Sequence, residues 1–388
     1  MAEPQTQPTQ TESLPVTVDA LAAAVVVVYV DAEQGLIVRS ASIVRDAIAA
    51  GPGSVQMATL YSDLRREADK TAAQVQAQVQ TMAHAVADTA ARNGNVTAAR
   101  EVRGYADRYA LSGNVSDLLP HDVNSARLMA QDLESRLSGA AHRITRFADD
   151  AYRAATASGA TAQILTDMGK ATPAEAQAQA WRELTSRGVK GFTDAKGREW
   201  NLATYVEMAT RTATQRAYNA SHRDRLTLAG IHYFTPSTTG RPCALCAPWE
   251  GKVLADVGAG EVTEPDASNG EPVKFAVAGT IEEAYAAGYG HPNCKHTLTA
   301  YLPGVTVLKP NQWTAANEQD YKNTQQLRAL ERAVRAAKVQ AAAALTPLDK
   351  ARAMRDARAG QARIRDFTAQ TGLMRRNRRE QIDLGLKP

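Results

Sequence analysis

The strongest constraint on the fold of this chain is a run of regularly spaced apolar residues between positions 123 and 151. Their spacing alternates between three and four residues without a break, and charged side chains occupy the other faces. This repeat is typical of a helix that buries one continuous stripe against other helices. The positions of the stripe are Val123, Ala126, Ala130, Leu133, Leu137, Ala140, Ile144, Phe147 and Ala151.

Other segments predict the same kind of structure. The span Met57–Arg92 has a helical pattern, and residues 172–188 place Pro173 near a first turn and Gly188 at a stop. Asp122 is a suitable N-cap for the helix that carries the apolar stripe. Because aromatic residues make up only 5% of the chain and alanine is abundant, helices with modest cores are favoured over a large β-sandwich.

The pattern changes after Gly188. A long helix is predicted over Leu202–Ala229, and short strands are predicted at Ile231–Thr235, Lys252–Leu254 and 272–279, among turns rich in Gly, Asp and Pro. These elements form a compact α+β module. A further helix is predicted beyond it from a second apolar stripe, which consists of Leu327, Leu330, Val334, Ala337 and Ala341.

We therefore predict a mainly α fold with a small α+β module, in four parts. Residues 1–15 have too little apolar surface to offset the entropy of ordering, which indicates a disordered arm. Residues 16–187 are expected to form a long helical bundle or arm that serves as a docking or scaffold domain. Residues 188–305 form the α+β module, and residues 306–388 form a helical, basic C-terminal segment.

Charge is unevenly distributed along the chain. The net charge is +4, but the segment Thr314–Pro388 alone holds sixteen Lys and Arg against eight Asp and Glu. A basic tail of this kind is expected where a chain meets nucleic acid or an acidic partner, although such residues also simply solubilise an exposed helix. The polar N-terminus does not resemble a signal peptide, and the apolar run Leu21–Val30 is about half a membrane span. We expect a soluble protein made in the cytosol.

The three cysteines of the chain fall in two short stretches. Cys243 and Cys246 form a Cys-x-x-Cys pair, and Cys294 lies between His291 and His296. A tight turn directs both thiolates of such a pair at one ion, and three thiolates with one imidazole make a closed structural zinc site. A metal would also compensate for the thin core of a small module. Passive packing of buried thiols and redox chemistry are the alternatives.

Catalytic interpretations of this region lack residues that they need. Pro-Cys-x-x-Cys is half of a zinc deaminase signature, but the nearest match to its other half, His222-Arg-Asp224, has Asp in place of Glu. The segment PSTTG faintly resembles the Ser-Thr-Ser element of ADP-ribosyltransferases, yet Ile281–Tyr285 offers only adjacent glutamates instead of Glu-x-Glu. An HNH nuclease would need further Cys-x-x-Cys pairs and an Asp-His dipeptide. We therefore expect no enzymatic activity.

With these residues in place, the chain resembles the phage head-morphogenesis proteins of the Mu F-like minor capsid family, in particular the group known as phage minor capsid protein 2. The resemblance covers residues 188–388 and rests on four pieces in order. These are the helix YVEMATRTATQRAYNASHRDRLTLAG, the C-x-x-C-x-x-x-x-G-K-V element from Cys243, the G-H-P-N-C element from Gly290, and the C-terminal segments YKNTQQLRALERAVRAAK and GLMRRNRREQI.

One position departs from the family pattern. The family commonly has H-P-x-C-x-C, and the last position here is His296. Because Cys and His both bind zinc, the change is compatible with intact coordination, in which His296 completes the site with Cys243, Cys246 and Cys294 and His291 supports or caps it. The reverse assignment, with His291 as the fourth ligand, remains open at this point.

The resemblance also implies a structural role in the virion, inside the phage head near the portal vertex, in assembly, DNA packaging or delivery. The implied partners are the portal protein, the major capsid protein and packaged double-stranded DNA, with no membrane. An enzyme-like effector carried in the virion and a host nucleic-acid-binding regulator are the alternatives. Four arginines could contact DNA phosphates without reading sequence: Arg375, Arg376, Arg378 and Arg379.

Overall fold

The computed structural model describes residues 17–106, 124–156, 173–193, 199–238, 242–309 and 313–382. The predicted arm (residues 1–15), the predicted N-cap Asp122 and the first stripe residue, Val123, lie outside these ranges. The helices are α1 (Val18–Ala50), α2 (Val55–Ala106), α3 (Asn124–Ile144), α4 (Phe147–Thr156), α6 (Pro173–Arg187), α7 (Leu202–Leu228), α8 (Ile281–Ala286), α9 (Ala315–Ala342) and α10 (Pro347–Thr371), with short 3-10 helices η1 (Ala247–Trp249) and η2 (Asn377–Glu380). The strands are β1 (Lys190–Thr193), β2 (Glu199–Asn201), β3 (Tyr233–Pro236), β4 (Val253–Ala255), β5 (Gly260–Pro265), β6 (Pro272–Thr280) and β7 (Leu298–Ala300).

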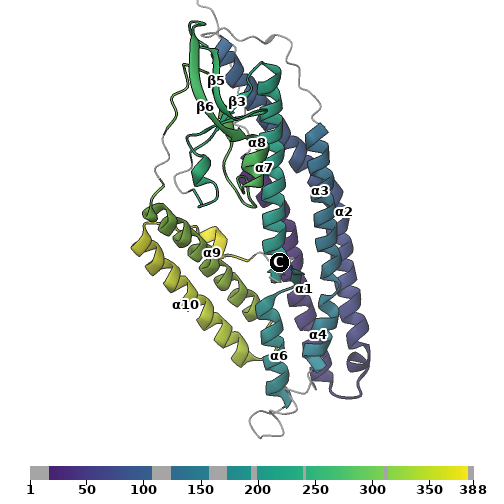
Figure 1. Cartoon of the computed structure of the whole chain (residues 1–388). Coiled ribbons are helices and arrows are strands. Elements are labelled where there is room, and N and C mark those ends of the chain that lie inside the picture. Colours follow the sequence, from purple (N-terminus) through teal and green to yellow (C-terminus); the bar gives the residue numbers. More distant parts are fainter. Residues whose placement is uncertain are drawn as a thin grey trace, which may run out of the picture.

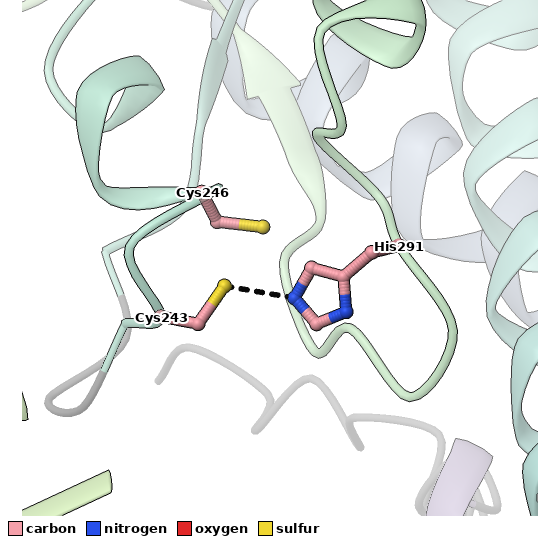
Figure 2. Close-up of side chains that lie close together, drawn as sticks. All are labelled: Cys243, Cys246 and His291. Carbon is pink, nitrogen blue, oxygen red and sulfur yellow. Dashed lines mark hydrogen bonds between the residues drawn. The ribbon is translucent and has the colours of Figure 1, made fainter. Parts of the chain in front are cut away.

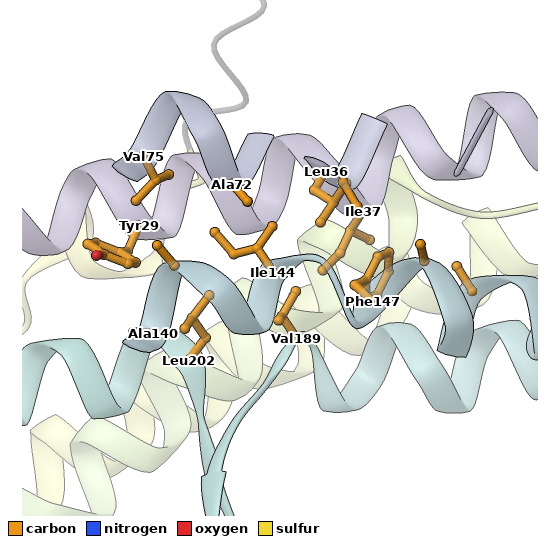
Figure 3. Packing of buried hydrophobic residues seen from close by; sticks show 14 of the residues in the cluster. Tyr29, Leu36, Ile37, Ala72, Val75, Ala140, Ile144, Phe147, Val189 and Leu202 are labelled. Carbon is orange, nitrogen blue, oxygen red and sulfur yellow. The ribbon is translucent and has the colours of Figure 1, made fainter. Parts of the chain in front are cut away.

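The long helices α1, α2, α3 and α7 pack side by side in an elongated bundle (Figure 1). Every described residue of the first apolar stripe, from Ala126 to Ala151, is buried, which confirms the prediction made from its spacing. In the core, Ile144 and Phe147 lie beside Leu36 and Ile37 of α1 (Figure 3). The predicted mainly helical fold is therefore correct.

The stripe runs across two helices where one was expected. Helix α3 ends at Ile144 and α4 begins at Phe147. Between them the Thr145 hydroxyl donates to the carbonyl of His142 over 2.9 Å, and a side chain that bonds the backbone in this way competes with regular helix geometry. The three-residue step from Ile144 to Phe147 keeps both side chains on the buried side, so the seam survives the break.

Helix α1 is the most apolar helix of the described residues. It alone among them is long and apolar enough to cross a membrane, with a mean hydropathy of 1.8 over an 18-residue window. The apolar run Leu21–Val30 is only part of this longer helix. In the structure 44% of that window is buried inside the protein, and Glu33 and Gln34 of the same helix are buried too. In this fold α1 is a helix of the bundle core.

A five-stranded mixed sheet lies at one end of the bundle, in the order β5-β6-β4-β3-β7 (Figure 1). All pairs of neighbouring strands in this sheet are antiparallel except β4 and β6, which are parallel. Phe234 at the centre of β3 faces Leu254 on one side and Ala300 on the other, and Val102 of α2 joins their apolar cluster. The three predicted strands are present within a few residues, whereas β5, β7 and the β1–β2 hairpin were not predicted.

Helices α9 and α10 form an antiparallel hairpin beside the bundle (Figure 1). Leu327, Val334 and Ala337 of the second predicted stripe are buried. Helix α10 ends at Thr371, and Gly372 follows in the left-handed conformation (φ 68°). The chain then turns back, and η2 packs on α9. The arginine cluster therefore lies beyond the helix and not within a continuous helical tail.

Candidate metal centre

The two cysteines of the Cys-x-x-Cys pair lie on one tight turn. The backbone N–H groups of Cys246 and Ala247 both donate to the carbonyl of Cys243, over 3.1 and 2.9 Å, and η1 begins directly after Cys246. The turn brings both sulfur atoms to the same side of the loop, where they face His291 (Figure 2). This is the geometry that the spacing predicted.

The second loop follows α8 and carries the other ligand candidates. Its HPNC turn is closed by the Cys294 N–H, which donates to the carbonyl of His291 over 2.9 Å. Gly290 enters this turn at φ 65°, and a Cβ at that position would lie 2.4 Å from the ring of Tyr285. Glycine is therefore required there by conformation and by space.

All five predicted ligand residues are brought together. They form two groups of three that share Cys246: one with Cys243 and His291, the other with Cys294 and His296. Within each group the ligand atoms lie within 4.8 Å of one another. One zinc ion bound by three thiolates and an imidazole would therefore draw the two groups together around Cys246.

The individual distances show how well each pair suits zinc. With Zn–S of about 2.3 Å and Zn–N of about 2.0 Å, tetrahedral ligands lie about 3.8 Å apart for two sulfurs and about 3.5 Å for sulfur and nitrogen. The Sγ atoms of Cys246 and Cys294 are 3.6 Å apart, and Cys294 Sγ is 3.4 Å from His296 Nδ1. The 2.8 Å between Cys243 Sγ and His291 Nε2 is instead a hydrogen-bond distance.

Each histidine is also held from its far side. His291 Nδ1 lies 2.8 Å from the carbonyl oxygen of Pro292, and His296 Nε2 lies 2.8 Å from Glu250 Oε1. The Glu250 and His296 side chains are only 5% and 4% exposed. Histidines that bind metals typically donate their second ring N–H to a carboxylate or a carbonyl, which fixes the ring. Sequence reasoning missed Glu250, because a single glutamate four residues after Cys246 has no diagnostic spacing.

The electrostatics favour thiolates at two of the cysteines. A hydrogen bond with the Cys246 thiol is the main factor that lowers the pKa of Cys243 to about 3 and that of Cys294 to about 4, while the same contacts raise the pKa of Cys246. A hydrogen bond with Cys243 raises the pKa of His291 to about 9. Burial opposes the charged form of His296, but contacts with Cys294 and Glu250 outweigh it and raise its pKa. Thiolates are the form of cysteine that binds metal.

The loop that carries Cys294 and His296 is tied to the helical bundle through α7. The side-chain amides of Gln215 and Asn219 both donate to the carbonyl of His296, over 3.3 and 3.1 Å. The Asn293 N–H donates to the hydroxyl of Thr212 over 3.3 Å, and Lys295 pairs with Asp19 of α1 at 3.0 Å. A change in the conformation of this loop would therefore alter its contacts with both α1 and α7.

The four arginines proposed for DNA contact are in two different situations. Arg375 donates through Nε and a terminal nitrogen to both oxygens of the buried Glu380, each over 2.7 Å. Arg379 lies 3.7 Å from Glu331. Arg376 and Arg378 are exposed, and no ion pair to another described residue is recorded for either.

His222, considered above as part of a deaminase signature, lies in α7 and faces α2. It is buried, its Nε2 lies 3.3 Å from Glu101, and its ring stacks on Tyr218. It belongs to neither of the two Cys/His groups found among the described residues.

Comparison with known families provides the identification. A family model described as phage minor capsid protein 2 matches residues 14–369, which is most of the chain. The chain belongs to this family. No curated protein and no solved structure matches it.

Membership in the family of minor capsid proteins supports a structural component of the virion. The match also corrects the extent of the resemblance seen in the sequence. It begins at residue 14, so that α1 to α6 belong to the family together with the α+β module, and it ends at residue 369. The segment GLMRRNRREQI, with its four arginines, lies beyond the match.

Proposed function

We propose that this minor capsid protein is a non-catalytic component of the phage head interior near the portal vertex, made in the host cytoplasm and used in assembly, DNA packaging or delivery. The observation that carries the proposal is the family match over most of the chain. The elongated bundle supports it, because long packed helices offer an extended docking surface. In this proposal the helices of residues 16–187 contact the portal protein, and the major capsid protein is a further neighbour.

Chemical cross-linking of purified virions tests this placement. We expect cross-links between lysines of this chain and the portal protein, including Lys70 of α2, which is exposed. Cross-links confined to the major capsid protein would contradict portal association while leaving the virion role intact.

We further propose that Cys243, Cys246, Cys294 and His296 bind one structural Zn²⁺, with His291 outside the ligand set. The fit rests on the near-tetrahedral distances from Cys294 Sγ to Cys246 Sγ and to His296 Nδ1, and on the buried carboxylate of Glu250 behind the His296 ring. The ion would stabilise the α+β module of residues 188–305.

Elemental analysis of the purified full chain tests the zinc site. We expect about one zinc per chain in the wild type. Cys294→Ala should lose it together with the protease resistance of residues 242–305, as should His296→Ala. His291→Ala is the matched control and should keep the metal. A well-folded wild type without metal would contradict the site, and zinc loss in His291→Ala alone would reverse the assignment of the two histidines.

A further inference from the structure

A second site lies along the bundle, away from the cysteines. A cavity of about 560 Å³ opens between α1, α7, α9 and η2, beside the end of α6. One wall is apolar and includes Val26 and Val30 of α1 and Val339 of α9. The remaining lining is dominated by arginine. The six that line it are Arg187, Arg211, Arg328, Arg332, Arg335 and Arg379.

Carboxylates also line the cavity, but they offset only part of the charge of these arginines. They are Glu33, Glu207 and Glu331, half as many as the guanidinium groups. Glu207 lies 3.0 Å from Arg211, and Glu331 lies 3.7 Å from Arg379. Glu33 instead accepts from the Val189 N–H over 2.8 Å and from the Asn201 amide.

Arg328 is the arginine of greatest interest. Within the part of the chain that the structure describes, no hydrogen bond or ion pair is recorded for it. Burial lowers its pKa, and the nearby positive charges of Arg211 and Arg379 lower it further, whereas the carboxylates of Glu207 and Asp19 act in the opposite direction. Arg335 is half-buried too and donates to the backbone carbonyl of Arg379. Half-buried guanidinium groups that repel one another are stabilised by an anion between them.

A neutral polar side chain also lines the cavity without a partner. Gln34 of α1 is only 6% exposed, and its Oε1 is buried with no hydrogen-bond partner among the described residues. Leaving such a group unsatisfied is costly. A half-turn of the carboxamide exchanges its oxygen for its NH₂ group, which would then donate to an oxygen of a bound ligand.

We propose that this cavity binds a phosphate group, either as the free ion or as part of a phosphate ester. Phosphate has more charge and more acceptor oxygens than a carboxylate, and forked guanidinium groups match it in pairs. The organic part of an ester would pack against the apolar residues of the cavity wall. Phosphate binding here would be a property separate from the proposed structural role and from the candidate metal centre.

The test compares thermal unfolding of the full chain in sodium phosphate, sodium acetate and sodium chloride at matched ionic strength and pH. We expect phosphate at millimolar concentrations to raise the midpoint by about 2–4 °C above chloride. Arg328→Gln and Arg335→Gln should each weaken the phosphate effect about tenfold in concentration. Arg358→Gln, an exposed arginine of α10, is the matched control and should respond as the wild type does. Because each variant is compared with itself across salts, a change in its basal stability does not obscure the result.

Two outcomes would overturn the proposal: equal phosphate effects in the wild type and both cavity variants, or an acetate effect as large as that of phosphate. The source of the phosphate is then tested with a short random DNA duplex. Competition between duplex and inorganic phosphate, lost in Arg328→Gln, assigns the site to a nucleic-acid backbone. Duplex binding that is independent of phosphate and of Arg328 assigns the cavity to free phosphate or a small ester.

Discussion

The two histidines of the candidate metal centre differ in the group that contacts the second nitrogen of each ring. His291 is held by a backbone carbonyl, whereas His296 is held by the buried carboxylate of Glu250. A carboxylate partner increases the basicity of the imidazole and fixes the ring orientation, so it strengthens the bond between histidine and metal. Glu250 should therefore matter for metal affinity although it is not itself a ligand.

Replacing Glu250 with Gln is expected to weaken zinc binding about 10- to 100-fold, because the amide keeps the shape of the side chain but loses its charge. Competition with a chromogenic zinc chelator measures this affinity. The matched control is Glu261→Gln, at an exposed position of β5, which should bind zinc as the wild type does. Equal affinities for the two variants would contradict this role of Glu250.

Glu33 makes stability depend on pH. Burial raises its pKa to about 7, despite hydrogen bonds from Val189 and Asn201. The folded state therefore holds this proton at pH values where the unfolded chain, with an ordinary glutamate pKa of about 4.3, has released it. The stabilisation that comes from protonated Glu33 is complete below the pKa of the unfolded chain and is lost as pH rises through about 7.

Glu33→Gln should remove this part of the pH dependence, because the amide cannot ionise and its carbonyl oxygen can still accept the same hydrogen bonds. Denaturant unfolding at several pH values between 5 and 8 measures the free energy of unfolding. The wild type should lose about 1–3 kcal/mol more than the variant across this range. Parallel curves for the two proteins would show that Glu33 does not titrate there.

At the scale of elements, the crossing of α2 and α7 depends on one glycine. A Cβ on Gly94 would lie 2.3 Å from the backbone carbonyl oxygen of Tyr218, which cannot move without shifting α7. These two helices also make the most extensive contact between any two described elements. The close approach at Gly94 therefore sets the separation of the helices that support the sheet.

Gly94→Ala is expected to destabilise the protein by about 1–3 kcal/mol, because overpacking at this contact outweighs the better helix propensity of alanine. Gly139→Ala in α3, where a Cβ would meet nothing within 4 Å, is the control. It should stabilise by about 0.5–1 kcal/mol. Chemical denaturation measures both, and changes of the same sign would contradict the role of Gly94.

The elements differ in how far the sequence predicts them. The helices with apolar stripes were predicted because burial repeats along the chain, and Leu133, Leu137 and Val334 are buried as expected. Strand β5 was missed because it lies at the sheet edge, its sequence GEVTEP is largely exposed, and it holds no apolar run. The break at Thr145 was missed because a local side-chain bond leaves no mark on the spacing.

The candidate site follows the same division. The five Cys and His residues were found because their spacing is distinctive, and the structure brings them together. Glu250 was missed because it lies 46 residues from His296 in the sequence. The arginine cavity was missed because the residues that line it come from elements far apart in the chain. Only the packing of α1 against α7 and α9 places those arginines around one space.

On the scale of the whole molecule, the basic C-terminal region folds back onto its own carboxylates. Arg375 forms an ion pair with Glu380, and Arg379 forms one with Glu331. Of the four arginines, only Arg376 and Arg378 are exposed. Fewer cations are therefore available to DNA than the charge of the segment indicates. Within the cluster of four arginines, we propose that non-specific contact with packaged DNA falls to these two exposed side chains.

The double variant Arg376→Gln/Arg378→Gln should bind a random duplex more weakly. The slope of log K against log salt should fall by about 2, because each lost contact releases about one fewer counterion. Fluorescence anisotropy across a salt series measures the slope. Arg92→Gln/Arg146→Gln removes two exposed arginines of the bundle and should leave it unchanged. Equal slopes in both double variants would exclude the tail as the contact.

The length of α2 has a consequence for anything that binds this protein. At about 1.5 Å per residue, its 52 residues form a helix about 78 Å long. One end carries Val102 into the core of the sheet module, and the other holds Tyr61 against Tyr152 of α4. Partners bound at the two ends of α2 would be held at a fixed distance from each other, so the protein can set the separation of two components in an assembly.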